Sequence, residues 1–338
     1  MKIDTVIQGD CREILKTLPD QSINCCVTSP PYYGLRDYGM EEQIGLEETP
    51  EEFINKLTEV FREVRRVLRD DGTLWLNMGD SYCGTGSKGD YQDPKYAEGR
   101  NGQRVSLTQK VNGCKNKDLI GIPWMLAFAL RNDGWYLRQD IIWHKPNPMP
   151  ESVKDRCTKS HEYIFLLSKK SKYYFDSDAI AEPITESSIE RYSQNIDDQT
   201  GSERVPFKTN GNMKAVLPAY KNLEYKGQQN HSMHERRAAG MDDIQYLHRN
   251  KRDVWSVTTK PCREAHFATF PEDLIEPCIL AGCPIGGVVL DPFFGSGTTG
   301  RVAAKFNRHY LGIELNPEYI EISTRRTNHV QMTMEGFV

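Results

Sequence analysis

Short apolar runs that favour β-strands alternate with amphipathic helical patterns along most of the chain, and this alternation restricts the possible folds more than any other feature. Strands that alternate with helices usually form a mostly parallel sheet with helices on both faces. Seven runs are predicted to be strands: residues 4–8, 23–28, 73–78, 135–143, 163–167, 287–290 and 310–314. The sequence therefore predicts an α/β, Rossmann-like fold with a seven-stranded, mostly parallel sheet.

The clearest predicted helix begins after Thr49. Pro50 stands in its first turn, Glu52 completes a T-x-x-E capping box, and Asp71-Gly72 is predicted to end it. Its apolar stripe has helical spacing and consists of Phe53, Leu57, Val60, Phe61, Val64 and Leu68. Shorter helices are predicted at residues 11–18, 123–131, 271–281, 298–306 and 317–328.

Two polar stretches interrupt this pattern. Residues 83–118 are rich in Gly, Lys, Asn, Gln and Asp, which predicts a long mobile loop, either a lid or plain disorder. Residues 177–250 interleave Asn, Gln and Arg, side chains that read base edges, with four tyrosines. We therefore expect a region inserted into the α/β domain at residues 177–250.

Charge and cysteine content exclude several classes of protein. The net charge of −4 argues against a general nucleic-acid coat protein, so any contact with DNA must come from local basic clusters. The nine cysteines show no C-x-x-C pair and no histidine at zinc-ligand spacing, which predicts reduced thiols and no metal site. Without a membrane-spanning run or a leader, we expect a cytoplasmic protein, in a bacterial cell or a phage-infected bacterium.

A glycine-containing turn, Asp291-Pro-Phe-Phe-Gly-Ser-Gly-Thr-Thr299, joins a predicted strand to a predicted helix. Gly295 and Gly297 allow a ligand to approach the backbone closely, and amides at the start of a helix can meet a negative group. Glu314 ends the next strand, where a carboxylate can accept hydrogen bonds from both hydroxyls of a ribose. Together these residues predict a nucleoside ligand.

A second constellation, Ser29-Pro-Pro-Tyr32, follows the predicted strand at residues 23–28. The two prolines fix φ and lack N–H groups, which leaves the carbonyls of Ser29 and Pro30 rigid and free to accept hydrogen bonds. A ligand group with paired N–H donors would suit them. The competing interpretation is that Pro30 and Pro31 end the strand and Tyr32 packs in the core.

Together the two constellations resemble the amino-methylating DNA methyltransferases of the β arrangement, which modify cytosine N4 or adenine N6 and carry a TSPPY-type catalytic motif. In that family the catalytic motif precedes the target-recognition region and the cofactor motif follows it. The resemblance implies the class I S-adenosylmethionine-dependent methyltransferase fold with circularly permuted motif order. It also implies a catalytic half at residues 1–176, a recognition region at 177–250 and a cofactor-binding half at 251–338.

The resemblance assigns a role to each matching residue. Ser29, Pro30, Pro31 and Tyr32 are expected to be catalytic, and Glu314 is expected to bind the cofactor ribose. The other residues expected to bind S-adenosyl-L-methionine are Asp10, Cys11, Thr269, Phe270, Asp291, Phe293, Gly295, Ser296, Gly297 and Thr298. Double-stranded DNA is the expected substrate, and a cognate restriction endonuclease is a partner that the family allows. The sequence leaves open whether the protein is a monomer or a homodimer.

An exocyclic base amine is a poor nucleophile because its lone pair is delocalised into the ring. If the Pro30 carbonyl and the Ser29 side chain accept the two amine protons, the lone pair is localised and can receive the methyl group directly. The target base must leave the duplex to be reached, at a cost of a few kcal/mol, and Tyr32 is expected to stack on it. A serine at position 29 favours cytosine N4.

Four alternatives remain open at this level. RNA as the substrate is disfavoured because no recognisable RNA-binding module accompanies the catalytic region. Adenine N6 is the alternative target within the family. A nicotinamide-dependent enzyme is disfavoured because the turn lies near the C-terminus and lacks a full G-x-G-x-x-G fingerprint. A DNA-binding protein without catalysis is disfavoured because both motifs are intact.

Overall fold

The computed structural model describes residues 1–35, 39–40, 42–84, 113–186, 248–259 and 270–335. The chain divides into two compact units, one formed by Met1–Ala179 with Arg252–Val338 and the other by Ile180–Lys251. Most of the predicted mobile loop at 83–118 and of the predicted recognition region at 177–250 lies outside the described residues. Within those residues, no helix is both long and apolar enough to span a bilayer.

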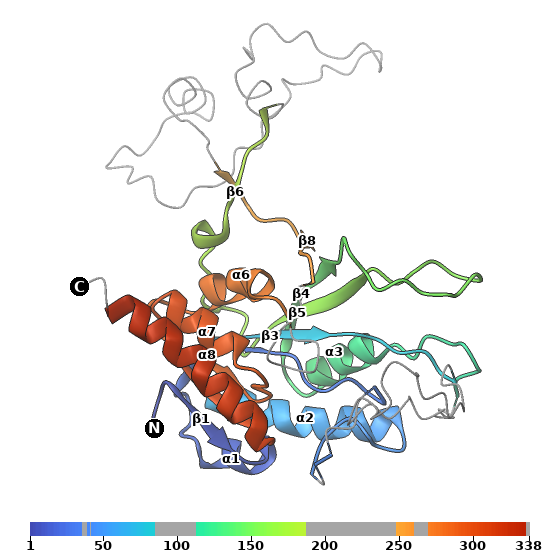
Figure 1. Ribbon diagram of the computed structural model, residues 1–338, viewed down its shortest axis with the longest axis horizontal. Helices are drawn as coiled ribbons and strands as arrows, with labels where there is room; N and C mark the ends of the chain where they lie inside the picture. Colours follow the sequence, from blue (N-terminus) through green and yellow to red (C-terminus); the bar gives the residue numbers. More distant parts are fainter. Residues whose placement is uncertain (36–38, 41, 85–112, 187–247, 260–269, 336–338) are drawn as a thin grey trace, which may run out of the picture. The chain divides into compact units, whose positions relative to one another are not determined.

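The first unit contains an eight-stranded sheet with the strand order β1-β10-β9-β2-β3-β5-β4-β8 (Figure 1). All neighbouring pairs are parallel except the two that involve β5, which runs antiparallel to β3 and to β4. The strands are β1 (Thr5–Gln8), β2 (Ile23–Thr28), β3 (Leu68–Met78), β4 (Tyr136–His144), β5 (His161–Ser168), β8 (Val254–Ser256), β9 (Val288–Asp291) and β10 (His309–Glu314).

The seven predicted strands are all present, and the predicted number is wrong by one. The additional strand, β8, has three residues and pairs with the outer edge of β4, with Trp255 opposite Trp143. Only Trp255 is buried in β8, so the strand carries too little apolar alternation to be recognised in the sequence.

Helices cover both faces of the sheet (Figure 1). The helices α1 (Cys11–Thr17), α2 (Pro50–Val67) and α3 (Ile122–Asn132) pack together on one face. The helices α6 (Glu272–Gly282), α7 (Thr298–Lys305) and α8 (Pro317–Glu335) pack together on the other. This arrangement confirms the α/β class and the mostly parallel sheet.

Helix α2 begins as predicted but ends earlier. The Thr49 side chain accepts a hydrogen bond from the Glu52 amide at 3.2 Å, and the predicted apolar stripe is buried. The predicted end at Asp71-Gly72 is wrong, because Leu68 has an extended backbone and pairs with Ile23 as the first residue of β3. Leu68 continues the helical spacing of apolar residues, yet sheet pairing determines its conformation.

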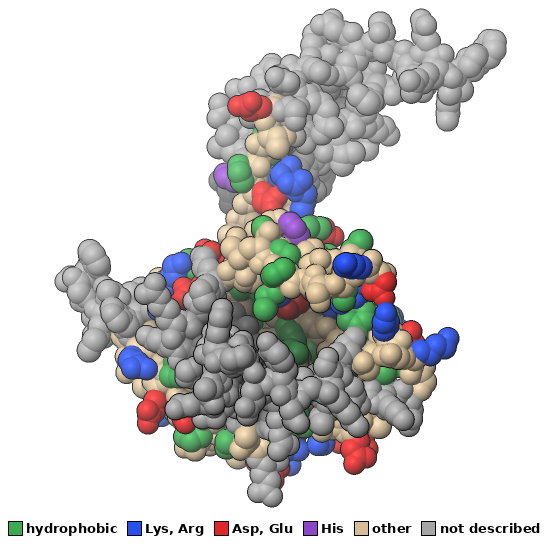
Figure 2. All heavy atoms as spheres, turned by 45° about the vertical axis from the view of Figure 1, so that its right-hand side comes forward, with side chains coloured by type: hydrophobic (Ala, Val, Ile, Leu, Met, Phe, Trp, Pro, Cys, Tyr) green, Lys and Arg blue, Asp and Glu red, His purple; other side chains and the backbone are tan. Residues whose placement is uncertain are grey.

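A short 3-10 helix, η1 (Asp178–Ile180), spans the point in the chain where the first unit ends and the second begins. In the second unit, β6 (Glu182–Pro183) pairs antiparallel with β7 (His248–Arg249). Arg249 and Lys251 lie 3.5 and 3.7 Å from the Glu182 carboxylate. Among the side chains coloured in Figure 2, basic and acidic groups are interspersed and not gathered by sign, in agreement with the small net charge.

Replacing Thr49 by alanine removes the cap of α2 and should lower the free energy of unfolding by about 1 kcal/mol. Thr58→Ala is the matched control, because the Thr58 hydroxyl donates to the Ile54 carbonyl inside the same helix and alanine is the better helix former there. Urea unfolding of both variants measures the difference. Equal losses in the two variants would contradict the capping role.

Candidate functional site

Four predicted site residues, Asp10, Ser29, Asp291 and Glu314, end or closely follow parallel strands at one edge of the sheet. Register places Gln8 of β1 beside Glu314 of β10, and Gly312 of β10 beside Asp291 of β9. Strand β2 follows β9 in the sheet, so the segment after Thr28 lies next along the same edge. Ligands of open α/β sheets bind at this carboxyl edge.

Asp291 joins the two predicted motifs. Its carboxylate is 1% exposed and accepts hydrogen bonds from the hydroxyls of Thr28 and Thr299, each at 2.6 Å, and from the Phe293 amide at 3.1 Å. Burial raises the pKa of Asp291 to about 6, although these three hydrogen bonds favour the ionised form. Because Thr28 directly precedes Ser29, the carboxylate fixes the Ser-Pro-Pro-Tyr segment beside the glycine-containing turn.

The two glycines of the turn are required for different reasons. Gly295 has φ +52°, and a Cβ there would meet nothing nearer than the Phe293 carbonyl at 3.9 Å, so open space adjoins its backbone. Gly297 has φ +79° and caps α7, and a Cβ there would lie 2.7 Å from the Cβ of Ser323. Gly295 thus leaves room for a ligand, whereas Gly297 allows α7 and α8 to approach each other.

Phe294 fixes the turn onto the sheet. Its ring is buried and stacks on Tyr310 with centroids 5.7 Å apart. A Cβ on Gly312 or Gly300 would lie 2.4 or 2.6 Å from Phe294 ring atoms, so both glycines are needed to accommodate the ring. The predicted ligand residue Phe293 is half-buried and packs against the core.

Glu314 lies beside Gly295 with hydrogen-bonding capacity to spare. One carboxylate oxygen accepts from the Gly295 amide at 2.7 Å and the other accepts from the Asn316 amide at 2.8 Å. Burial raises the pKa of the Glu314 carboxyl. Each oxygen can accept about two hydrogen bonds, so the pair still has room for two hydroxyls, as a ribose requires.

Ser296 and Thr298 are buried under α8. Arg326 of that helix donates to the Ser296 hydroxyl at 2.5 Å and to its carbonyl at 2.7 Å, and it lies 3.5 Å from the Thr298 hydroxyl. The sequence gives no signal for Arg326, since nothing in the helical pattern of residues 317–328 distinguishes it. The direct contacts of Ser296 and Thr298 with a cofactor stay a prediction.

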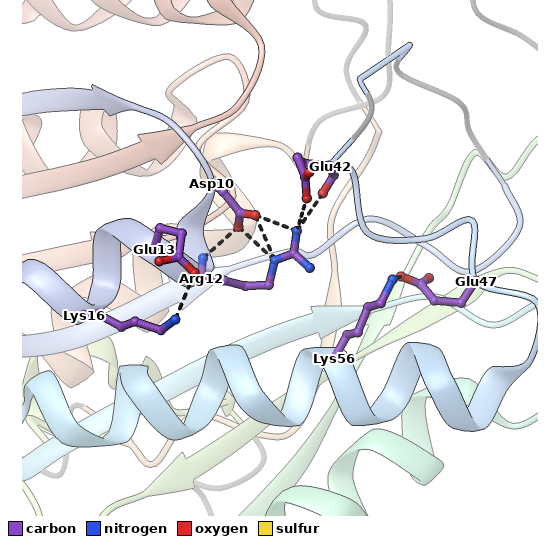
Figure 3. A network of polar contacts seen from close by, with 7 residues as sticks. All are labelled: Asp10, Arg12, Glu13, Lys16, Glu42, Glu47 and Lys56. Carbon is purple, nitrogen blue, oxygen red and sulfur yellow. Dashed lines mark hydrogen bonds and ion pairs between the residues drawn. The ribbon is translucent and has the colours of Figure 1, made fainter.

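Asp10 caps α1 and is held by Arg12 (Figure 3). The Arg12 guanidinium donates to both Asp10 oxygens at 2.5–3.0 Å and to the Glu42 carboxylate at 2.9 Å. The hydrogen bond to Asp10 raises the pKa of Arg12. The neighbouring Cys11 thiol is buried, which raises its pKa to about 12, so it is not a nucleophile at neutral pH.

The Ser-Pro-Pro-Tyr segment follows β2 at the same edge, with Pro30 buried and Ser29, Pro31 and Tyr32 half-buried. The Tyr32 hydroxyl donates to the Glu162 carboxylate at 2.7 Å. The sequence motif predicts a role for Tyr32 but not its partner Glu162, which comes from a strand 130 residues away.

The segment that carries Thr269 and Phe270, both expected to bind the cofactor, is described only at its end. Thr269 lies outside the described residues. Phe270 is half-buried and directly precedes Pro271, the N-terminal cap residue of α6. The roles of both residues stay predictions.

Comparison with known proteins gives similarity over nearly the whole chain. A family model described as DNA methylase matches residues 23–325. The Type II methyltransferase M.Cfr9I of Citrobacter freundii is 46% identical over 324 residues, which cover 95% of this chain and 87% of that protein.

Two solved structures share the fold. PvuII DNA methyltransferase (cytosine-N4-specific) has a TM-score of 0.57 and 17% identity, covering 97% of this chain and 89% of that one. The protein TTHA0409 of Thermus thermophilus, solved in complex with S-adenosyl-L-methionine, has a TM-score of 0.54 and 23% identity, covering 96% of this chain and 93% of that one.

The raised pKa of Asp291 predicts a pH-dependent stability. The folded state binds this proton more tightly than the unfolded state, so the stabilisation is complete below about pH 4 and is lost as the pH rises through about 6. The free energy of unfolding of the wild type, minus that of Asp291→Asn, should fall by about 2 kcal/mol from about pH 4 to 7.

Urea unfolding of the two proteins across this pH range makes the measurement. The carboxyl of Glu314 titrates in both proteins, so the effect of its burial cancels in the difference, whereas the repulsion between the two carboxylates is present only in the wild type. A difference that stays constant with pH would show that Asp291 titrates normally.

Proposed function

The chain belongs to the DNA methylase family, and from that premise we propose that it transfers a methyl group from S-adenosylmethionine to the exocyclic N4 of cytosine in double-stranded DNA. Membership in this family contradicts the nicotinamide-dependent alternative. The choice of base, the extrusion of that base from the duplex and the roles of the individual residues are parts of the proposal.

The hydrogen bond from Thr28 to the buried carboxylate of Asp291 carries this proposal. It holds the segment suited to accept amine protons beside the turn suited to bind a nucleoside. Transfer between two bound molecules requires that both be held within reach, and such positioning supplies much of the rate of a direct displacement.

S-adenosylmethionine is the cofactor, and when bound it supplies an electrophilic methyl group on a sulfonium centre. The remaining hydrogen-bonding capacity of Glu314 suits its ribose, and the open space beside Gly295 suits close approach of its methionine part. The further contacts proposed are those of Asp10, Cys11, Thr269, Phe270, Asp291, Phe293, Ser296, Gly297 and Thr298.

Ser29 and Pro30 act on the target amine in this proposal. The Pro30 carbonyl and the Ser29 hydroxyl oxygen accept one amine proton each, which opposes delocalisation of the nitrogen lone pair into the ring. The adjacent Pro31 lacks an N–H that could compete for these acceptors. The amine thus becomes the nucleophile without a covalent enzyme intermediate.

Tyr32 supports the extruded base. A base within the duplex cannot reach the carboxyl edge of the sheet, so it must be flipped out, and stacking on an aromatic ring offsets part of that cost. Tyr32 is half-buried, which leaves part of the side chain available for such a contact.

Ser29 favours cytosine N4, since in this family serine at the first motif position is associated with cytosine and aspartate or asparagine with adenine. Adenine N6 is the second candidate. We further propose that residues 177–250 read the target sequence. The similarity to Type II methyltransferases supports a role in restriction and modification, with a cognate restriction endonuclease as the functional partner.

The product identifies the base. Purified protein incubated with unmethylated genomic DNA and methyl-labelled S-adenosylmethionine should yield N4-methylcytosine after digestion to nucleosides and mass spectrometry. N6-methyladenine would replace the cytosine assignment, and no methylated nucleoside from folded protein would favour the DNA-binding alternative.

Glu314→Ala should weaken S-adenosylmethionine binding by about 10- to 100-fold, because hydrogen bonds to a charged group contribute about 1.5–3 kcal/mol. Titration calorimetry measures this affinity. Glu318→Ala, an exposed carboxylate in the first turn of α8, is the matched control and should bind normally. Unchanged affinity in Glu314→Ala would remove the ribose assignment.

Tyr32→Ala should keep the affinity for S-adenosylmethionine and lower the rate of methyl transfer.

A further inference from the structure

We propose that Glu162 is a positioning residue that sets the plane of the Tyr32 ring for the target base, with Lys145 and Asn77 holding Glu162 in place. The inference rests on the proposed function, in which Tyr32 stacks on the extruded base.

The Tyr32 hydroxyl is engaged from two strands. It donates to Oε2 of Glu162 on β5 at 2.7 Å and lies 3.3 Å from Oδ1 of Asn77 on β3. The Asn77 amide donates to the Tyr163 carbonyl at 3.0 Å and lies 3.4 Å from the same Glu162 oxygen. The acceptor of the phenol proton is therefore itself held by its neighbours.

Glu162 is paired with Lys145 in a site with little exposure to water. Their side chains are 15% and 19% exposed and form an ion pair, and the Lys145 ammonium lies 4.3 Å from the centre of the Trp143 ring. Removing both charges from water is costly, and apolar side chains of similar size would fill such a place without that cost. The ion pair is therefore better explained by the strong hydrogen bond that the Glu162 carboxylate forms with the Tyr32 phenol than by a contribution to folding stability.

The ring of Tyr32 is confined by the backbone at Gly79, directly after β3, as well as by its hydroxyl. A Cβ on Gly79 would lie 2.5 Å from Cε2 of Tyr32, a distance that would displace the ring. The φ of Gly79 lies outside the left-handed region, so the contact with the ring accounts for the glycine at this position. The ring is fixed along one edge and at its hydroxyl.

Strand register makes this arrangement rigid. Residues Asn77 and Met78 pair with Ile164 and Tyr163, which places Asn77 next to the start of β5. Trp143 pairs with Glu162, so Lys145 follows β4 at the same edge. Groups held by strand ends keep an aromatic ring ordered before the ligand arrives, which reduces the entropy lost on stacking.

The test is a double-mutant cycle between Tyr32→Phe, which removes only the hydroxyl, and Glu162→Leu, which removes the acceptor. Each substitution should lower kcat for methyl transfer to unmethylated genomic DNA about tenfold. The double variant should also lose about tenfold, not about a hundredfold, because both substitutions remove the same hydrogen bond between Tyr32 and Glu162. Glu162→Gln, which retains an acceptor oxygen, should lose less. The affinity for S-adenosylmethionine and the Tm of Tyr32→Phe should match the wild type.

Two further variants separate positioning from general damage. Gly79→Ala should lower kcat in the wild-type background but have no further effect in Tyr32→Ala, where the displaced ring is absent. Glu151→Gln, which removes a carboxylate paired with Arg156 at 2.6 Å, is the matched control and should keep the wild-type kcat.

Two results would overturn the inference: a hundredfold loss in the Tyr32→Phe/Glu162→Leu double variant, or a wild-type kcat in Glu162→Leu. Either leaves the proposed function intact if the wild type still produces a methylated nucleoside. Failure of the wild type to methylate DNA would overturn the proposed function and this inference with it.

Discussion

The buried carboxylate of Asp291 is the interaction on which the rest of the site depends. It satisfies hydroxyls from Thr28 and Thr299, and it thereby ties the end of β2 to the start of α7. Removing the Asp291 carboxylate would take this hydrogen-bond acceptor from both buried hydroxyls. A buried polar group left unsatisfied lowers the stability of the fold by about 1–3 kcal/mol. A residue whose sequence position predicted ligand binding therefore also holds a segment that lies 263 residues from it in the chain.

The features of the fold that the sequence predicts correctly are those determined by interactions between residues close together in the chain. The seven strands, the start of α2 and the glycine-containing turn are all encoded by residues near one another in the chain. The end of α2 was wrong and β8 was missed, because the pairing of Leu68 with Ile23 and of Trp255 with Trp143 decides those segments. Pairing between distant strands carries no signal in a short window of sequence.

The same reason explains which site residues could be found. Glu314 and Asp291 stand at ends of predicted parallel strands, where ligands of such sheets bind, so their positions were sufficient to propose them. Glu162 begins β5, the antiparallel strand, and only antiparallel pairing brings its beginning to the edge where the parallel strands end. Arg326 reaches the turn from α8, a contact that no spacing within the helix predicts.

Three carboxylates, those of Asp291, Glu314 and Glu162, lie along one edge of the sheet, and each is stabilised differently. Hydroxyls and one backbone amide surround Asp291, and two backbone amides hold Glu314. Glu162 instead has an ammonium partner. Neutral donors leave the charge uncompensated, and burial raises the pKa of Asp291 and Glu314. In the proposed function, the side of the edge that receives the base therefore holds a paired charge suited to orient Tyr32, whereas the side proposed to bind the cofactor keeps negative charge suited to a sulfonium cation.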